Sequence, residues 1–335
     1  MKDRCLIIAE AGVNHNGNVD LALSLCDAAK SAGADVVKFQ TWKTEKLITQ
    51  NVGQADYQKN NTGKAESQFD MLKRLELSYD DFRVIKKHCD DIGIIFASTA
   101  DEPESLDFLV ELGIPFIKVG SGDIGNISYL RYIGSKKLPV ILSTGMSSLN
   151  DVEISLTALK EGGADNITVL HCTTSYPCPY EDVNLNAMIT LRDTFGLPIG
   201  YSDHTVGKEV ALAAVALGAK VVEKHFTLDC KMEGPDHLAS TEPDAFKDMV
   251  KSIRNIENCL GTGEKKPTEA EKSISKVVTK RIVALTCIAK GTAFTPENIG
   301  VKRNDIGHLA SEWDDVVGKV SDKDYEADEG ITIKC

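Results

Sequence analysis

The sequence lacks any apolar run long enough to cross a membrane. A transmembrane helix needs about 20 consecutive apolar residues, and no stretch of the chain approaches that length. The first residues lead directly into a short strand-like run, without the apolar core of a signal peptide. We therefore expect a cytoplasmic protein with no membrane partner.

Clustered basic residues and paired cysteine motifs are also missing. The 335 residues carry a net charge of −12, and the lysines alternate with acids, so no basic stripe is available for a nucleic acid. The nine cysteines show neither zinc-type nor secreted-framework spacing, which favours reduced thiols. An anionic substrate would have to be held by local positive charge.

The chain contains enough hydrophobic residues to form a large core. Hydrophobic residues make up 42% of the sequence and charged residues 26%, as in ordinary globular proteins. The length exceeds one average domain and suits a barrel of about 250 residues with a small appendage.

Short apolar runs alternate with helix-like segments through the first 225 residues. The runs cover residues 6–9, 36–40, 94–98, 116–119, 140–143, 168–171, 199–202 and 221–224, and the helical segments 21–32, 79–92, 104–112, 151–161 and 208–217. Eight strand–helix units predict an α/β fold of the (β/α)₈ TIM-barrel type, with an open doubly wound sheet as the alternative. The polar insertion at 44–77 is typical of a long substrate-side loop, here with one short helix.

The pattern changes after residue 262. Residues 261–271 contain Gly, Lys and Pro without an apolar face, as linkers do. Residues 280–335 return to short β-type runs separated by turns. We expect a catalytic barrel over 1–262, a linker over 263–279 and a compact module over 280–335.

Polar side chains close all eight predicted strands. They are Glu10, Asn14 and His15; Lys38 and Gln40; Ser98 and Thr99; Lys118, Ser121 and Asp123; Ser143 and Thr144; His171, Thr173 and Tyr176; Ser202 and His204; Glu223 and His225. Barrel enzymes place their active sites at this end of the strands. Buried charge is costly unless it is paired or binds something, so the rim is predicted to bind a ligand. A ring of mutual ion pairs is the alternative.

Two histidines close consecutive strands. Neighbouring strands lie about 5 Å apart, so His204 and His225 can reach one metal ion. Imidazole ligands completed by carboxylate or water suit Mn²⁺, Zn²⁺ or Fe²⁺ better than Ca²⁺. No cysteine is expected close to this pair.

Lysines and hydroxyl groups on the other strands suit an anion. Lys38, Lys118, Thr99, Ser202 and the GlySerGlyAsp turn at 120–123 offer ammonium groups, hydroxyls and open backbone amides, which a phosphate needs. A Schiff-base lysine is one alternative. A lysine paired with Glu10 or Glu223 is the other.

Seven ordered motifs resemble the nonulosonate synthases, the family that includes N-acetylneuraminate, legionaminate and pseudaminate synthases. The motifs are IIAEAGVNHNG at 7–17, VVKFQT at 36–41, KVGSGD at 118–123, ILSTGM at 141–146, YSDHT at 201–205, EKHFT at 223–227 and GPDH at 234–237. The tail resembles the antifreeze-like (SAF, β-clip) domain that follows the barrel in this family.

The resemblance implies an enzyme that joins phosphoenolpyruvate to an amino-sugar aldehyde and releases phosphate. The sugar would be N-acetylmannosamine or a 2,4-diacetamido-2,4,6-trideoxy-hexose. It also implies a divalent metal, usually Mn²⁺ but also Mg²⁺ or Co²⁺, and a domain-swapped homodimer. Carried over by position, the metal ligands are His204 and His225, the phosphoenolpyruvate ligands Lys38, Thr99, Lys118, Ser121, Thr174 and Ser202, the catalytic residues Glu10, Asp123 and Tyr176, and the sugar ligands Gln40, Tyr176, Asp236 and Arg303.

Three positions depart from the family pattern. Some members have Glu at the place of Asp123 and Asn at that of Thr174, and Pro usually stands where this chain has Asn304. A metal-dependent pyruvate aldolase and a non-catalytic sugar-binding protein are the rival functions. The identity of the sugar stays open, although segments 54–58 and 66–68 favour the legionaminate and pseudaminate side.

Overall fold

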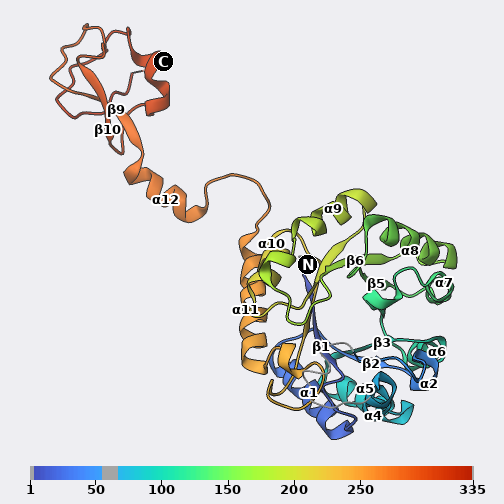
Figure 1. The fold of residues 1–335 in the computed structure, drawn as a ribbon. Coiled ribbons are helices and arrows are strands. Elements are labelled where there is room, and N and C mark those ends of the chain that lie inside the picture. Colours follow the sequence, from blue (N-terminus) through green and yellow to red (C-terminus); the bar gives the residue numbers. More distant parts are fainter. Residues whose placement is uncertain (1–3, 55–66, 334–335) are drawn as a thin grey trace. The chain divides into compact units, whose positions relative to one another are not determined.

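A computed structural model describes residues 4–54 and 67–333, which form two compact units, Met1–Gly261 and Thr262–Cys335. The first unit is a closed barrel with its strands in chain order (Figure 1). The strands are β1 (Leu6–Gly12), β2 (Val36–Thr41), β3 (Ile95–Ala100), β4 (Ile117–Val119), β5 (Val140–Ser143), β6 (Ile167–Cys172), β7 (Ile199–Asp203) and β8 (Val221–His225). The prediction of a (β/α)₈ barrel is confirmed, and the open sheet is wrong.

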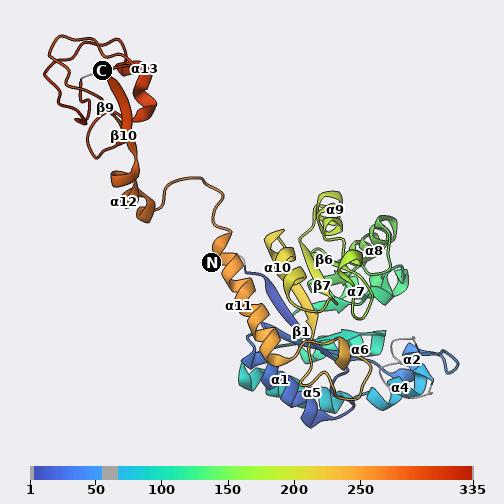
Figure 2. The same cartoon turned by 60° about the vertical axis from the view of Figure 1, so that its left-hand side comes forward.

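Helices surround the barrel between successive strands. They are α1 (Val19–Ser31), α5 (Tyr79–Ile92), α6 (Pro103–Leu112), α7 (Ile127–Ser135), α8 (Leu149–Gly162), α9 (Asn186–Phe195), α10 (Glu209–Ala216) and α11 (Pro243–Cys259). Capping boxes begin α5 at Ser78 and α8 at Ser148. Left-handed glycines end α5 and α6. The last helix, α11, packs against α10 and α1 and so completes the ring (Figures 1 and 2).

The barrel interior has an apolar layer below its polar rim. Ile8, Val36, Ala97, Phe116, Ile141, Leu170 and Val221 form this buried cluster. Side chains two positions apart on a strand point the same way, so the next inward residues are Glu10, Lys38, Thr99, Lys118, Ser143, Cys172 and Glu223. The strands therefore carry a polar layer directly above a packed floor.

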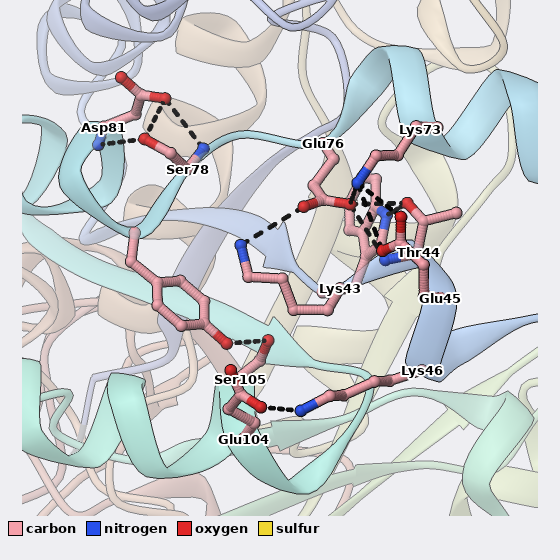
Figure 3. A network of polar contacts seen from close by, with 12 residues as sticks. Lys43, Thr44, Glu45, Lys46, Lys73, Glu76, Ser78, Asp81, Glu104 and Ser105 are labelled. Atoms are coloured by element: carbon pink, nitrogen blue, oxygen red, sulfur yellow. Dashed lines mark hydrogen bonds and ion pairs between the residues drawn. The ribbon is translucent and has the colours of Figure 1, made fainter.

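In its described part, the insertion after β2 contains two short helices, α2 (Thr44–Leu47) and α4 (Gln68–Leu75), where one helix was expected. Residues 55–66, which include most of the segments that favoured particular sugars, lie outside the described part. Glu76 connects the two helices (Figure 3). Its carboxylate accepts hydrogen bonds from Thr44 N at 3.0 Å and from Thr44 Oγ1 at 2.8 Å, and it lies 3.2 Å from Lys73 Nζ. The two helices lie side by side (Figure 2).

The second unit is a small β-rich module with its own core. Strands β9 (Lys280–Ala284) and β10 (Ile299–Arg303) pair antiparallel, and a short helix, α13 (Trp313–Val316), follows. Ile282, Phe294 and Tyr325 belong to its buried cluster.

The expected linker contains a helix, α12 (Glu269–Val278), which a capping box between Thr268 and Glu271 begins. None of its residues is buried. In the part of the chain that the structure describes, no helix combines the length and apolarity needed to span a bilayer.

Candidate active site

A cavity of about 210 Å³ opens at the carboxyl ends of the strands. Its walls come from loops or ends of all eight strands. Among the lining residues are most of the predicted site residues: Glu10, Lys38, Gln40, Thr99, Lys118, Ser121, Thr174, Tyr176, Ser202, His204 and His225. Asp101, Ser143, Cys172 and Glu223 line it as well. The rim residues thus face one common space.

Four buried charges form the base of the cavity. Lys38 Nζ lies 2.6 Å from Glu10 Oε2 and 4.0 Å from Glu223 Oε2, and Lys118 Nζ lies 3.5 Å from Glu223 Oε1. Burial and the two carboxylates act in opposite directions on Lys38, and the carboxylates win, so its pKa is raised. Burial likewise opposes ionisation of Glu223, but Lys118 and Lys38 outweigh it and lower its pKa. The lysine–carboxylate pairing that the sequence analysis gave as an alternative is present, in a cavity that is still open to a ligand.

Hydroxyl groups surround the two ammonium groups. Lys38 Nζ donates to Thr99 Oγ1 at 3.0 Å, and Lys118 Nζ donates to Ser143 Oγ at 2.8 Å. Ser121, in the short 3₁₀ turn η1 (Ser121–Asp123), accepts from the Gly145 amide at 2.9 Å. A side chain at position 145 would collide with Thr174 Oγ1 and Ser121 Oγ. The backbone must approach closely here, as it does where proteins hold anions.

The two histidines face each other across β7 and β8. Their ring centroids are 5.5 Å apart, and the Tyr176 ring lies 4.2 Å from His204 and 5.6 Å from His225. His204 Nδ1 donates to the Thr173 carbonyl oxygen at 2.8 Å, so Nε2 is the nitrogen that a metal would bind once the ring is neutral. Burial opposes a charge on His204, but the neighbouring Cys172 outweighs burial and raises its pKa. His225 Nδ1 is buried without a hydrogen-bond partner in the described chain. Burial, followed by His204, holds the pKa of His225 well below its usual value.

A complete protein-only metal shell is not formed. Over residues 4–54 and 67–333, no group of three or more His, Cys, Asp or Glu side chains is arranged to hold a metal ion. The Asp236 carboxylate lies 4.0 Å from His225 Nδ1. Two neutral imidazole nitrogens fit a divalent ion whose other ligands are water or substrate oxygens.

A cysteine lies beside the histidines, contrary to expectation. Cys172 Sγ is 3.9 Å from His204 Nδ1 and 3.8 Å from Ser121 Oγ. The run predicted over 168–171 stops one residue short, and β6 in fact continues to Cys172. Extending the alternation from Leu170 by two positions would have pointed this side chain inward.

One acid that the sequence predicts does not line the cavity, and another that it does not predict takes that place. Asp123 does not line the cavity, and Asn126 Nδ2 donates to it at 3.1 Å. Asp101 lines the cavity instead, just after β3. Burial, and then the neighbouring Asp123, raise the pKa of Asp101 to about 7. Continuing the inward alternation of Ala97 and Thr99 past the end of β3 would have found it.

A second hollow of about 130 Å³ shares Gln40, Tyr176 and His225 with the cavity. Asp236 lines it, and burial, with Glu10 next, raises the pKa of this acid to about 6. Gly12, at a φ of 50°, shows how closely the acids converge, since a Cβ there would lie 3.3 Å from Gln40 Nε2 and Glu10 Oε1 and 3.7 Å from Asp236 Oδ2. Glu10 thus connects this hollow to Lys38 at the base of the cavity.

Other polar residues of the rim do not line the cavity. His171 Nε2 donates to the Val183 carbonyl at 2.7 Å, and Asn14 Nδ2 donates to the Phe226 carbonyl at 2.9 Å. These two residues hold loops together. Arg303 ends β10 in the second unit and is exposed; its role in a site on the barrel stays a prediction.

Comparison with known proteins identifies the family. The NeuB family model matches residues 25–265, and the SAF domain model matches residues 279–335. The N,N'-diacetyllegionaminic acid synthase of Legionella pneumophila is 46% identical over 94% of this chain and 89% of its own length. The synthase of the same name from Campylobacter jejuni is 45% identical over 98% and 99%.

More distant relatives are sugar-acid synthases as well. The human N-acetylneuraminate-9-phosphate synthase is 37% identical over 89% of this chain and 83% of its own. The crystal structure of the N-acetylneuraminic acid synthetase from Leptospira borgpetersenii superposes with a TM-score of 0.71 at 34% identity, covering 81% of this chain and 90% of that one. The resemblance seen in the motifs is confirmed: the chain belongs to the NeuB family of sugar-acid synthases and carries a SAF domain after its barrel.

Proposed function

We propose that this enzyme is a nonulosonic acid synthase that joins phosphoenolpyruvate to the aldehyde of an N-acylated amino sugar. One observation carries the proposal: two buried ammonium groups and a pair of imidazoles line the same 210 Å³ cavity. The first group suits a phosphorylated acid, and the second suits a carbonyl oxygen bound through a metal. The names of the relatives, which are legionaminic and neuraminic acid synthases, support this reading.

The lysines and hydroxyls would bind phosphoenolpyruvate. Lys38 and Lys118 offer charge to its phosphate and carboxylate, and Thr99, Ser121 and Thr174 offer hydroxyl groups. Ser143, beside Lys118, and Ser202, on the same cavity wall, extend this set. Glu10 and Glu223 hold the ammonium groups in place. The histidines line the same cavity, so the bound enol would share it with the metal site.

His204 and His225 would hold the divalent ion, Mn²⁺ first and Mg²⁺ or Co²⁺ next. The free Nε2 of His204 and the unpartnered Nδ1 of His225 fit such a ligand. When bound, the ion supplies Lewis-acid polarisation of the sugar aldehyde. Tyr176 packs against both rings and Gln40 lies beside Glu10, so these two side chains would orient the sugar.

The proton steps fall to the acids around the cavity. A bond forms between C3 of phosphoenolpyruvate and the aldehyde carbon, and the aldehyde oxygen takes a proton. Water then adds to the former C2 and loses a proton, and the C2–O bond to phosphate breaks. Burial keeps the pKa of Glu10 raised although Lys38 opposes it, so Glu10 can hold the proton that passes between water and the sugar oxygen. Asp123 would act on this step through Asp101.

The test is a coupled assay of phosphate release and product mass. Enzyme, phosphoenolpyruvate, Mn²⁺ and an N-acylated mannosamine should give free phosphate and a nine-carbon acid. Lys118→Met should abolish both signals, whereas Lys160→Met, on the exposed face of α8, should leave them unchanged. Condensation with pyruvate, and no phosphate from phosphoenolpyruvate, would instead establish the aldolase. Sugar binding without turnover would establish the sugar-binding protein.

The metal needs a readout that does not depend on activity. Mn²⁺ titration followed by electron paramagnetic resonance should show one tight ion in the wild type and weakened binding in His225→Ala. Full turnover in EDTA would remove the ion from the reaction.

A further inference from the structure

Asn14 lies in the loop after β1 and is buried beside the site without lining it. The residue is 1% exposed, and it borders neither the cavity nor the neighbouring hollow. Its side-chain amide donates two hydrogen bonds, to the Phe226 carbonyl oxygen at 2.9 Å and to Ser240 Oγ at 2.9 Å. Asn14 therefore holds the chain that follows β8 at two places at once.

The bond to Ser240 continues to Asp236. Ser240 Oγ accepts from Asn14 and donates to the Asp236 carbonyl oxygen at 2.7 Å. A hydroxyl group can accept and donate at the same time, and consecutive hydrogen bonds of this kind strengthen one another. These three residues form one path from the loop after β1 to an acid that lines the hollow.

The bond to Phe226 holds the end of β8. Phe226 directly follows His225, so its carbonyl group is next to one of the paired imidazoles. Thr241 N donates to the His225 carbonyl oxygen at 2.8 Å, which brings the chain after Asp236 back to β8. Between these fixed points, Asp236 Oδ2 lies 4.0 Å from His225 Nδ1.

The 4.0 Å separation has a chemical consequence. It exceeds the roughly 2.7–3.2 Å of a hydrogen bond, so Asp236 leaves Nδ1 of His225 without a hydrogen-bond partner in the described chain. A shift of Asp236 towards the ring would close this bond, and a shift away from it would withdraw the carboxylate from a ligand held there. Neither group fixes the spacing by itself, because the two do not bond to each other.

We propose that Asn14 is a positioning residue, which through Ser240 sets the place of Asp236 relative to His225. This inference rests on the proposed function, with Asp236 as a ligand of the sugar. Asn14 would act on the alignment of the sugar without touching either reactant. Its amide is suited to this role because one nitrogen offers two protons to two different acceptors.

The first experiment measures steady-state kinetics of Asn14→Leu with the sugar and phosphoenolpyruvate varied in turn. The sugar is N-acetylmannosamine or the 2,4-diacetamido-2,4,6-trideoxy-hexose, whichever the wild type converts. We expect KM for the sugar to rise about tenfold or more, because small misplacements in a site are costly. KM for phosphoenolpyruvate should change little, since Asn14 does not contact Lys38 or Lys118. An unchanged KM for the sugar would overturn the inference, whereas a wild type that releases no phosphate with either sugar would count against the proposed function.

Two further variants test the path itself. Ser240→Ala breaks its middle link and should raise KM for the sugar in the same way, even if Asn14→Leu fails to fold. In an Asp236→Ala background, Asn14→Leu should have little further effect on kcat/KM for the sugar, because both changes remove one contact. Losses that simply multiply would show that Asn14 acts independently of Asp236, and the inference would be wrong.

The matched control is another asparagine of the same loop. Asn18 accepts from the amides of Asp20 and Leu21 at 2.8 and 3.2 Å and so caps α1. Asn18→Ala should lower stability but leave KM for the sugar unchanged. If it raised KM for the sugar as much as Asn14→Leu does, general weakening of the loop would explain both results and the specific path through Ser240 would be rejected.

Discussion

Single charges govern how the cavity receives an anion. Lys38 and Lys118 already pair with Glu10 and Glu223, and an arriving phosphoenolpyruvate adds further negative charge to the cavity. Nearby acids oppose it only when they are ionised. Asp101, whose pKa is raised to about 7 by burial and Asp123, is such an acid. It is neutral below about pH 7 and charged above it.

The first prediction is a pH dependence of phosphoenolpyruvate binding that Asp101 causes. KM for phosphoenolpyruvate should rise as pH increases through 7, because the newly formed carboxylate repels the ligand. Asp101→Asn should remove most of that rise while Asp165→Asn, on the surface, keeps it. Steady-state kinetics from pH 6 to 9 measure the effect. The same slope in Asp101→Asn as in the wild type would contradict it.

Most inward residues could be predicted at this scale, because strand alternation is a local property. Ile8 and Glu10, or Phe116 and Lys118, are separated by two positions in the sequence and in the structure alike. Asp101 was not predicted because it lies beyond the end of β3. Its elevated pKa depends on packing and on Asp123, neither of which a strand pattern contains.

A buried ion pair joins the elements that carry the two histidines. Asp203 Oδ2 lies 2.7 Å from Lys224 Nζ, and Asp203 Oδ1 accepts from the amide and hydroxyl of Thr205 at 2.9 and 2.7 Å. Lys224 also donates to the Thr205 carbonyl at 2.7 Å. Both charged side chains are almost fully enclosed, and each directly precedes one histidine. The pair therefore fixes the ends of β7 and β8 relative to each other.

The second prediction concerns this ion pair between Asp203 and Lys224. Lys224→Met leaves a buried carboxylate without its partner and should cost about 3–5 kcal/mol of folding free energy. It should also weaken Mn²⁺ binding, because the imidazoles lose their alignment. Urea unfolding of the metal-free protein and Mn²⁺ titration measure the two effects. Arg131→Gln, which breaks an exposed pair with Glu161 between α7 and α8, should change stability by no more than about 1 kcal/mol and leave Mn²⁺ binding unchanged. Equal results for the two variants would refute the role of this buried ion pair in aligning the ends of β7 and β8.

Elements with local signals could be predicted, and those without could not. Apolar runs and terminal glycines mark the strands and helices α5 and α6. Helices α7 and α9 begin without a side-chain cap, and the sequence analysis did not assign them. Helix α10 also lacks such a cap but was predicted, because its run of apolar residues gives a signal of its own. Helix α12 has a cap and carries Ile274 and Val277 on one face, but these side chains are exposed in the structure, and the Gly-, Lys- and Pro-containing start of the segment resembles a linker.

At the scale of the whole molecule, the two units have separate cores. We propose from the family resemblance that Arg303 binds the acyl-amino group of the sugar in the partner subunit of a homodimer. Each active site would then need the barrel of one subunit and the arginine of its partner. A defect at Arg303 should therefore inactivate the site on the partner's barrel.

The third prediction is complementation between two inactive variants. Lys118→Met and Arg303→Ala should each be inactive alone. After unfolding and refolding together, random pairing should restore roughly a quarter of wild-type activity, because half of the dimers then contain one intact site. Each variant refolded by itself is the control. A mixture that stays at background would show that Arg303 serves its own barrel.

The fold of both units could be anticipated from the sequence, but the choice of sugar could not. Strand–helix alternation and the motifs of the barrel are spread evenly along the chain. The 130 Å³ hollow beside the cavity, in contrast, includes Met71, Leu72 and Leu75 of a mostly polar insertion, which packs against Val13 after β1. That contact is long-range, so periodicity within the segment does not show it.

The hydrogen bonding of β1 to β8 has a consequence for the synthesis of this protein. In that pairing Glu10 lies opposite His225, and the two residues are separated by most of the barrel sequence. A nascent chain emerging from the ribosome thus has no catalytic pocket until its eighth strand is available to close the ring. Truncated products released before that point should lack the closed ring that brings these two residues together.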